Sequence, residues 1–342
     1  MHKYYTIPLL ILFILSNPAL SQVNFESDVS NRGTVAAAFL EIGVNARAQA
    51  MGGAYSAMRG NSDMIYWNPA GLAYVDGISG SFTNTQWLAE TTFNFASFAI
   101  PLPGIKTVVA TSFTTLGVPE QQVRSFNGNL TGEFYDARDY ALNISVATRL
   151  IPSFSVAVST KYISQRIWSE KATGLGFDFG VSYETPISGL FMGASITNFG
   201  GDMSMDGRNL NDIIDPDPNN EGVTNIPVKL ETDEFPLPQI FRFGLAYEYT
   251  KNDFSTTTSI DLNHPRGSTE SMNIGFETGF KELIFLRAGY QNLFEDDHIN
   301  GLTFGVGIQS MLSSSKRFAF DYAMSDWGLL GNAHRFSMNF SL

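Results

Sequence analysis

The sequence contains no cysteine, so neither a disulfide framework nor a lipid on an N-terminal cysteine can stabilise or anchor the chain. Charged residues make up only 16%, and acidic residues outnumber basic ones, which gives a formal net charge of −12. We expect no nucleic-acid partner, because no surplus of basic side chains exists to neutralise phosphates. Beyond about the first twenty residues there is also no long apolar run. A spanning helix needs about 20 consecutive apolar residues, so the mature chain offers no transmembrane helix.

The first residues have the features of a signal peptide. Lys3 supplies a positive start, residues 7–15 form a short apolar core, and small residues precede Gln22. The apolar core is too short to cross a membrane. We therefore expect residues 1–21 to be a cleaved signal peptide for export through the general secretory pathway.

The rest of the sequence is rich in strand and turn residues and alternates with a period of two from about Ser79 onward. Aromatic residues make up 13% and 31 residues are glycine. Since successive residues of a strand face opposite sides, each segment has one apolar face and one small or polar face. One segment shows the apolar face clearly, at alternate positions: Leu175, Phe177, Phe179, Val181 and Tyr183.

Charge falls almost entirely on the small or polar face of these segments. A charge on the lipid face of a membrane barrel costs about 2–4 kcal/mol near the midplane, whereas the lumen tolerates it. A soluble sandwich would place the polar face in water, where Lys and Glu are common, but here Gly, Ala, Ser, Thr and Asn dominate. The pattern predicts a barrel with a crowded, protein-filled lumen; the charged positions are Asp139, Arg149, Lys161, Asp178, Glu184, Arg242, Glu248, Asp261, Glu277 and Asp321.

The connections between segments alternate between short and long. We count about fourteen segments, and the longest connections are 117–136 and 200–238. Outer-membrane barrels have an even number of strands, short periplasmic turns and longer outer loops. The fold class expected is all-β: a transmembrane antiparallel barrel of about 14 strands formed by residues 78–342, in the cell outer membrane of a Gram-negative type of cell.

Residues 22–77 do not alternate and are expected to form a hatch, or plug, because a barrel of this width is not filled by its own side chains. The segment contains two blocks, FLEIGVNARAQAMGGAY from Phe39 and YWNPAGL from Tyr66. Asn68 can cap a short helix with Pro69 in its first turn. Gly52, Gly53 and Gly71 permit positive φ or close backbone approach. Arg47 and Glu41 are candidates to pin the hatch to lumen charges such as Asp178, Glu277 or Arg242, or else to pair locally.

These two blocks, in this order before an alternating barrel, resemble the PorV/PorQ family of FadL-like outer-membrane proteins. The resemblance implies a fourteen-stranded barrel with an N-terminal hatch. Members studied as PorV serve the type IX secretion system, where they bind exported proteins and associate with a large translocon barrel. Members of the wider FadL-like group import hydrophobic solutes. The final residue is Leu342 where an aromatic residue is more usual.

The sequence therefore predicts a non-enzymatic barrel that acts in type IX secretion or surface attachment through its outer loops. The alternative is passive transport of hydrophobic solutes. Expected partners are outer-membrane lipid and secretion-system or exported proteins, with hydrophobic small molecules in the alternative; no cofactor is expected. The hatch motif residues are Glu41, Gly43, Arg47, Met51, Gly52, Gly53, Trp67, Asn68, Pro69 and Gly71. The partner-binding loop residues are Phe126, Phe134, Asp215 and Asp217.

The residue types suggest three other kinds of site: a calcium site, a catalytic site and an apolar binding site. Acidic residues between 211 and 221 supply oxygens for calcium, but the spacing matches no calcium loop. Histidines predicted near the outer rim, His264, His298 and His334, lack the nucleophile context that a catalytic triad needs. An apolar site for a ligand or partner is the third, with Phe113, Phe134, Phe199, Met203 and Met205 as its lining.

Overall fold

The computed structural model describes residues 33–216, 225–295, 301–311 and 316–342. The expected signal peptide and the first residues of the hatch, 22–32, lie outside these ranges. The barrel strands are β1 (Ser79–Gln86), β2 (Thr92–Leu102), β3 (Thr107–Arg124), β4 (Leu130–Ile151), β5 (Phe154–Ile167), β6 (Glu170–Glu184), β7 (Leu190–Gly200), β10 (Ile240–Lys251), β11 (Phe254–Pro265), β12 (Ser271–Phe280), β13 (Ile284–Leu293), β14 (Leu302–Met311), β15 (Arg317–Asp326) and β16 (Asn332–Ser341).

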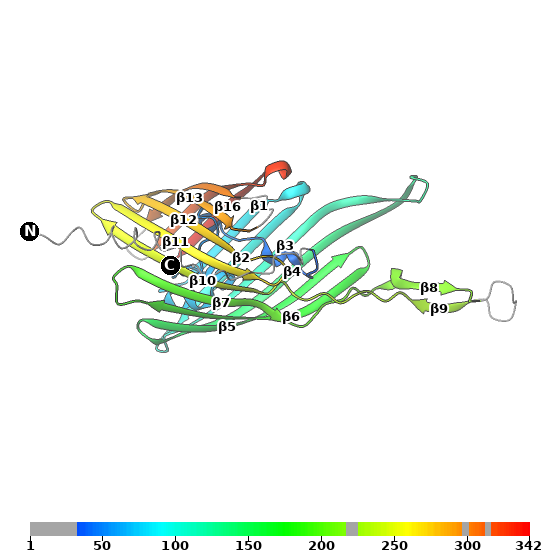
Figure 1. The fold of residues 1–342 in the computed structure, drawn as a ribbon, viewed down its shortest axis with the longest axis horizontal. Helices are drawn as coiled ribbons and strands as arrows, with labels where there is room; N and C mark the ends of the chain where they lie inside the picture. The colour runs from blue at the N-terminus through cyan, green and yellow to red at the C-terminus, as the bar shows by residue number, and fades with distance from the viewer. Residues whose placement is uncertain (1–32, 217–224, 296–300, 312–315) are drawn as a thin grey trace, which may run out of the picture. The chain divides into compact units, whose positions relative to one another are not determined.

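These fourteen strands form a closed antiparallel barrel in which β1 pairs with both β2 and β16. Closure leaves no unpaired strand edge, which is the condition for a β-structure to cross a bilayer. Short turns join the strands at one end, which we call the turn end, and this end also holds Ser79 and Ser341. The longer connections lie at the other end, the loop end (Figure 1). The predicted fold class is confirmed.

The inward and outward sides of the strands that the period of two predicts are also observed. Phe179 is 44% exposed on the outside of the barrel, whereas its neighbour Asp178 is fully buried inside. Asp261, Glu277 and Asp321 are likewise buried in the lumen. Strand β2 departs from this rule, because Phe93 and Phe95 face inward and are buried while Phe98 faces outward. β2 carries phenylalanine on both faces, so its pattern alone does not assign the faces.

The hatch is a chain of short helices folded within the lumen. It contains η1 (Ala38–Glu41), α2 (Ala46–Ala50), α3 (Met64–Trp67) and η2 (Pro69–Tyr74). The Asn68 side chain accepts from the N–H of Ala70 and Pro69 occupies the first turn of η2, as the sequence predicts. Gly52 and Gly53 have φ of 65° and 70°, the left-handed conformation that favours glycine. Among the described residues, no helix is long and apolar enough to cross a membrane.

The two long connections contain structure that the sequence did not predict. Residues 117–136 were expected to be a loop, but β3 and β4 continue as a paired hairpin beyond β2 and β5, with Gln122 opposite Phe134 and Arg124 opposite Leu130. The strand pattern was missed there because both faces of a free hairpin meet solvent, so no apolar alternation marks them. The connection from β7 to β10 holds η4 (Arg208–Leu210) and a separate two-stranded sheet of β8 (Asn211–Ile214) and β9 (Ile226–Lys229). Two further short helices, η3 (Leu88–Glu90) and η5 (Gly328–Leu330), lie in loop-end connections.

Candidate functional site

An ion-pair network pins the hatch to the barrel wall. Arg47 donates from Nε and Nη2 to the two carboxylate oxygens of Glu277, at 2.8 and 2.7 Å. Glu277 also accepts from Arg287, which in turn pairs with Asp321 at 2.7 Å. Asn339 donates to the other oxygen of Asp321. Of the partners suggested for Arg47 by the sequence, the structure selects Glu277.

Further hydrogen bonds join the hatch backbone to inward-facing wall side chains. Asp261 accepts from the N–H groups of Tyr55 and Ser56 at 3.0 and 2.8 Å. Thr303 accepts from the Gly52 N–H and donates to the carbonyl of Ala50. Short helices leave many backbone groups without intrahelical partners. The polar lumen supplies those partners, which explains why the inner face is rich in Ser, Thr and Asp.

Glycines of the wall allow the hatch backbone to approach closely. A Cβ added at Gly193 would fall against the carbonyl of Ser56, and one at Gly289 would fall against the N–H of Gly52. In the hatch, a Cβ at Gly71 would lie 2.7 Å from the carbonyl of Met58. The sequence drew attention to the hatch glycines but not to their wall counterparts. The signal was present, because glycine recurs on the inner face of the strands.

Asn68 joins the two blocks of the hatch motif to the wall. Its Nδ2 donates to the carbonyl of Ser56 at 2.8 Å and to the carbonyl of Val181 at 2.9 Å. Its Oδ1 accepts from the Ala70 N–H at 3.1 Å. The side chain is fully buried, so these bonds have no competition from solvent. Neighbouring Trp67 packs edge-on against Tyr55 and Tyr66.

We expect Asn68→Asp to lower the free energy of unfolding by about 2–4 kcal/mol, although the side chains have nearly the same size. The carboxylate keeps the bond from Ala70 but faces two carbonyl oxygens that it cannot donate to. The measurement is the temperature at which the folded barrel loses its heat-modifiable mobility in gel electrophoresis. Asn61→Asp is the matched control, since Asn61 is partly exposed beside the turn-end opening. An equal effect of both changes would contradict this role of Asn68.

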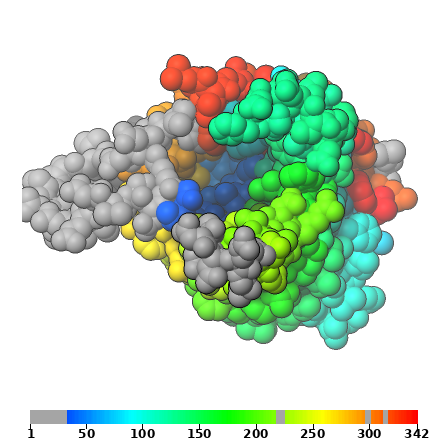
Figure 2. Space-filling view, turned by 90° about the vertical axis from the view of Figure 1, so that its right-hand side faces the viewer, coloured from blue at the N-terminus to red at the C-terminus, as the bar shows by residue number. Residues whose placement is uncertain are grey.

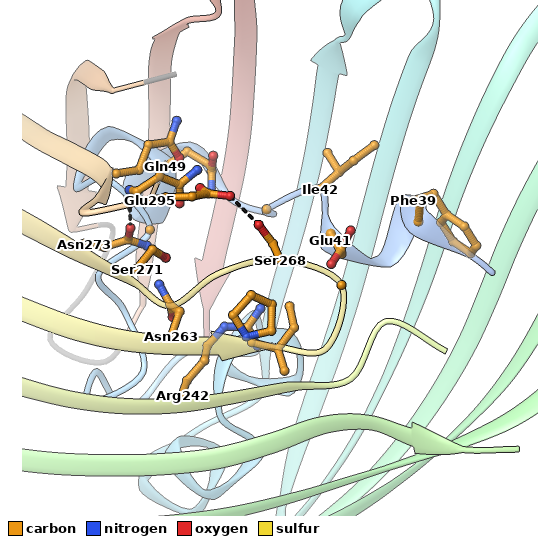
Figure 3. A pocket seen from close by; sticks show the side chains of 18 of the residues that line it. Phe39, Glu41, Ile42, Gln49, Arg242, Asn263, Ser268, Ser271, Asn273 and Glu295 are labelled. Atoms are coloured by element: carbon orange, nitrogen blue, oxygen red, sulfur yellow. Dashed lines mark hydrogen bonds between the residues drawn. The ribbon is translucent and has the colours of Figure 1, made fainter. Parts of the chain in front are cut away.

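A cavity of about 580 Å³ lies above the hatch at the loop end. Figure 2 views this end, and the hatch residues in blue are visible in the hollow between wall elements. The cavity lining combines aromatic rings with polar side chains from the hatch, the wall and the loops. It includes Phe39, Glu41, Tyr66, Trp67, Trp87, Arg242, Gln291, Trp327 and Arg335. Figure 3 shows the cavity from close by, with Phe39 and Glu41 on the hatch and Arg242 on the wall.

Glu41 and Arg242 are opposite charges that both line this cavity. The carboxylate of Glu41 is exposed to the cavity, but the surrounding protein displaces water and raises its pKa, while the charge of Arg242 acts in the opposite direction. Arg242 donates to the Thr197 hydroxyl at 3.0 Å and lies over the rings of Tyr66 and Trp67. The predicted pinning role of Glu41 is therefore not seen, because no ion pair to it is present among the described residues.

A second cavity, of about 400 Å³, opens on the turn-end side of the hatch. It is lined by Arg47, Glu277 and Arg287 of the pinning network, and by Arg59. Nη1 of Arg59 lies 3.1 Å from a carboxylate oxygen of Glu184, and Cζ of Arg59 lies 3.6 Å from the ring centre of Phe191. The two cavities have the hatch between them, so it separates the two ends of the lumen.

The remaining hatch motif residues pack against the rest of the hatch or against the barrel wall. Gly43 lies against the side chain of Gln49, Met51 is fully buried, and a Cβ at Gly52 would lie 2.8 Å from wall carbonyls. Gly53 packs against Trp67, and Pro69 is buried beside Asn68.

The predicted loop residues lie apart from the cavity lining. Phe126 is fully exposed between β3 and β4, and Phe134 is 49% exposed on β4. Asp215 is exposed after β8, while Asp217 lies outside the described residues, as does Glu221. Phe113 and Phe199 face outward from the wall, whereas Met203 is buried against Gly174.

The histidines that were weighed for catalysis do not meet one another. His264 bonds to Glu270 at 2.9 Å, and His334 bonds to the hydroxyl of Tyr322 at 2.8 Å. His298 lies outside the described residues. Within the described ranges, no group of three or more His, Cys, Asp or Glu residues is placed to hold a metal ion.

Comparison with solved structures identifies the fold. The toluene transporter TbuX of Ralstonia pickettii matches with a TM-score of 0.53 at 13% identity, over 87% of this chain and 97% of that chain. The CymD monoaromatic hydrocarbon channel matches with the same score and identity over 88% and 97%. The Pseudomonas putida toluene transporter TodX does so over 87% and 96%. At this identity the likeness shows the fold alone, a barrel of the outer-membrane type.

No family model and no curated protein sequence matches the chain. The resemblance of the two hatch blocks to the PorV/PorQ family therefore stays a prediction.

Proposed function

We propose that the chain is a non-enzymatic outer-membrane protein that takes up small hydrophobic molecules from outside the cell through its loop-end cavity. The observation that carries this proposal is the cavity of about 580 Å³, lined by aromatic rings above the hatch. Rings and a few polar groups are typical of small-molecule sites. The toluene transporters and the hydrocarbon channel that share the fold support the same class of solute. The loop end then faces outward, and residues 1–21 are removed on export.

Passage beyond the cavity requires the hatch to shift, because the hatch separates the two cavities. The absence of cysteine makes this testable with an engineered disulfide. The hydroxyls of Ser62 in the hatch and Ser97 in β2 lie 2.9 Å apart and are buried. Cysteine is close to serine in size, and the short separation suits a disulfide.

The test is uptake of radiolabelled toluene by cells that carry the Ser62→Cys, Ser97→Cys double variant in place of the native chain. We expect oxidised double-variant cells to lose uptake and to recover it on reduction. Each single variant is a matched control and should transport normally. If cells without the gene took up toluene and longer hydrocarbons as fast as the parent, the transport proposal would be wrong. Unchanged uptake with a fully formed disulfide would exclude movement of this part of the hatch.

A second function, in type IX protein secretion or attachment of exported proteins at the cell surface, is favoured by the projecting β3–β4 hairpin. Beyond its neighbours this hairpin exposes Phe126, Leu130, Phe134 and Tyr135. Exposed apolar side chains on a paired ribbon are typical of a protein contact surface. The hatch blocks that resemble PorV/PorQ point to the same function.

The test of this second function is a crosslinking pull-down with the native chain and with the Phe126→Ser, Phe134→Ser variant. Recovery of exported proteins or a very large barrel by the native chain, but not by the variant, would support it. Ile105→Ser is the matched control, because Ile105 is an exposed apolar residue in a turn-end connection. An unchanged secreted proteome after gene deletion would count against it.

A further inference from the structure

Two buried arginines of the lumen lack a carboxylate partner, and both line the loop-end cavity. Lys161 pairs with Asp178 at 2.9 Å, and Arg287 pairs with Glu277 and Asp321. In contrast, Arg242 and Arg335 are 6% and 1% exposed, and neither has an acidic oxygen within 4.0 Å among the described residues. A buried charge without a partner is costly. Its presence in a cavity indicates a binding role.

Arg335 is the less compensated of the two. Its Nη1 donates to the Ser325 hydroxyl at 3.0 Å, and its guanidinium lies 5.1 Å from the ring centre of Trp87. Its Nε has no acceptor. Arg242 interacts with the opposite charge of Glu41, and it is the main positive charge that acts on that carboxylate. A planar guanidinium whose Nε edge is unpaired can bind a carboxylate through two parallel hydrogen bonds.

Four other buried polar atoms of this cavity lining have no partner among the described residues: Nε2 of Gln291, the indole Nε1 atoms of Trp67 and Trp327, and the hydroxyl of Thr269. The hydroxyl can donate or accept, and the other three are donors. An indole N–H and an amide NH₂ can only donate. Buried donors in native proteins almost always have an acceptor. The missing group is therefore an acceptor, and beside Arg335 an anionic one.

Arg335 and Gln291 both line the loop-end cavity. The guanidinium of Arg335 reaches Ser325 of β15, and Ser325 is opposite Thr303 of β14. Thr303 is opposite Gly289 of β13, and Gln291 lies two residues further along the same face. Thr303 also bonds to the hatch below. Gln291 therefore lies two strands away from the Ser325 that Arg335 contacts, on the wall of the same cavity.

Aromatic rings lie beside Arg335 in the cavity. Trp87 and Trp327 pack edge to face with their ring centres 4.9 Å apart, and Arg335 stacks over Trp87. The acidic side chains of the cavity interact with other groups: Glu295 accepts from Ser268 at 2.6 Å (Figure 3), and the charge of Glu41 interacts with that of Arg242. A flat ring fits against the two indoles, and the volume is ample for one such molecule.

We propose that the loop-end cavity binds an aromatic monocarboxylate, with its carboxylate on Arg335 and its ring against Trp87 and Trp327. This assignment rests on the proposed uptake function and narrows its hydrophobic solutes to aromatic molecules that carry one carboxylate. A neutral ring can still pack against the indoles, but it binds more weakly because it leaves the Arg335 donors without an acceptor.

The test is equilibrium binding of benzoate, benzamide and toluene to the purified full chain in detergent at pH 7.5. We expect benzoate to bind about 10- to 100-fold more tightly than benzamide. Arg335→Gln should reduce benzoate affinity to the benzamide level and leave toluene affinity unchanged. Trp168→Phe is the control, since Trp168 lies outside the cavity lining.

Gln291→Glu provides a second variant if Arg335→Gln does not fold, because it keeps the side-chain size and repels an anion. It should weaken benzoate binding and spare toluene. Equal binding of benzoate and toluene by the native chain would overturn the carboxylate assignment and leave hydrophobic uptake intact. Acetate binding as tight as benzoate would overturn the aromatic part of the assignment. Failure of all ligands, together with unimpaired toluene uptake in cells without the gene, would remove both the inference and the proposed function.

Discussion

Glu277→Gln is expected to lower the free energy of unfolding by about 3–5 kcal/mol, because it removes the carboxylate shared by the buried Arg287 and the partly buried Arg47. Glu277 is 4% exposed and accepts from both Arg47 of the hatch and Arg287 of the wall. Oε2 of Glu277 accepts from Nε of both arginines and Oε1 accepts from Nη2 of Arg47. A glutamine has no negative charge, and whichever way its amide is turned, the NH₂ group faces at least one guanidinium N–H. The hatch should loosen together with the wall, because Arg47 loses its only ion-pair partner among the described residues.

The matched change on the other side of this pair is Arg47→Met. We expect a smaller loss, about 1–3 kcal/mol, because Glu277 keeps its bond to Arg287. Unfolding by urea in detergent gives both values, and the double variant completes a cycle that isolates the coupling between the two side chains. The rate at which an added protease cleaves the hatch provides an independent readout of how firmly the hatch is held. If Glu277→Gln proved no worse than Arg47→Met, the central position of Glu277 in the network would be wrong.

Phe179→Arg is expected to prevent most of the chain from assembling as a folded barrel. Phe179 faces outward near the middle of β6, where an arginine in lipid costs about 2–4 kcal/mol. Phe179→Leu is the matched control at the same position and should assemble normally, since it keeps an apolar side chain. The measurement is the fraction of heat-modifiable protein in isolated outer membranes. Normal assembly of the arginine variant would contradict the assignment of the phenylalanine-rich face to lipid.

The neighbouring glycine is not a suitable control for this experiment, although the sequence alone predicts that Gly180→Ser blocks assembly far less than Phe179→Arg. A Cβ at Gly180 would fall onto Oδ1 of Asn68 and lie 3.0 Å from the N–H of Ala70. Serine at Gly180 should therefore disturb the seating of the hatch. The pattern shows that position 180 faces the lumen, but it cannot show that the hatch lies directly against it.

The type of fold followed from local chemistry that every segment carries. The period of two assigned Phe179 outward and Asp178 inward, because a strand side chain has only two faces to choose from. Asn68 before Pro69 defined a helix start, and Gly52 and Gly53 defined a tight turn, because capping and positive φ depend on adjacent residues. These features are local, so they can be read without coordinates.

Contacts between distant parts of the chain could not be predicted in this way. Arg47 had several possible partners, and Glu277, 230 residues away, is selected by the order of the strands and by how the hatch sits in the lumen. The projecting β3–β4 hairpin exposes apolar side chains on both faces, as at Phe134 and Tyr135, so no alternation marks its strands. Arg335 looked like any inward residue of the last strand.

The sequence by itself determined the barrel, its lipid-facing side and the presence of a hatch, because alternation and turn chemistry act between neighbours. Only the tertiary structure decided which charges pair, which glycines admit the hatch and which side chains line the cavity with Arg335. Closure of the barrel sets the relative heights of all strands at once, and no single segment contains that information.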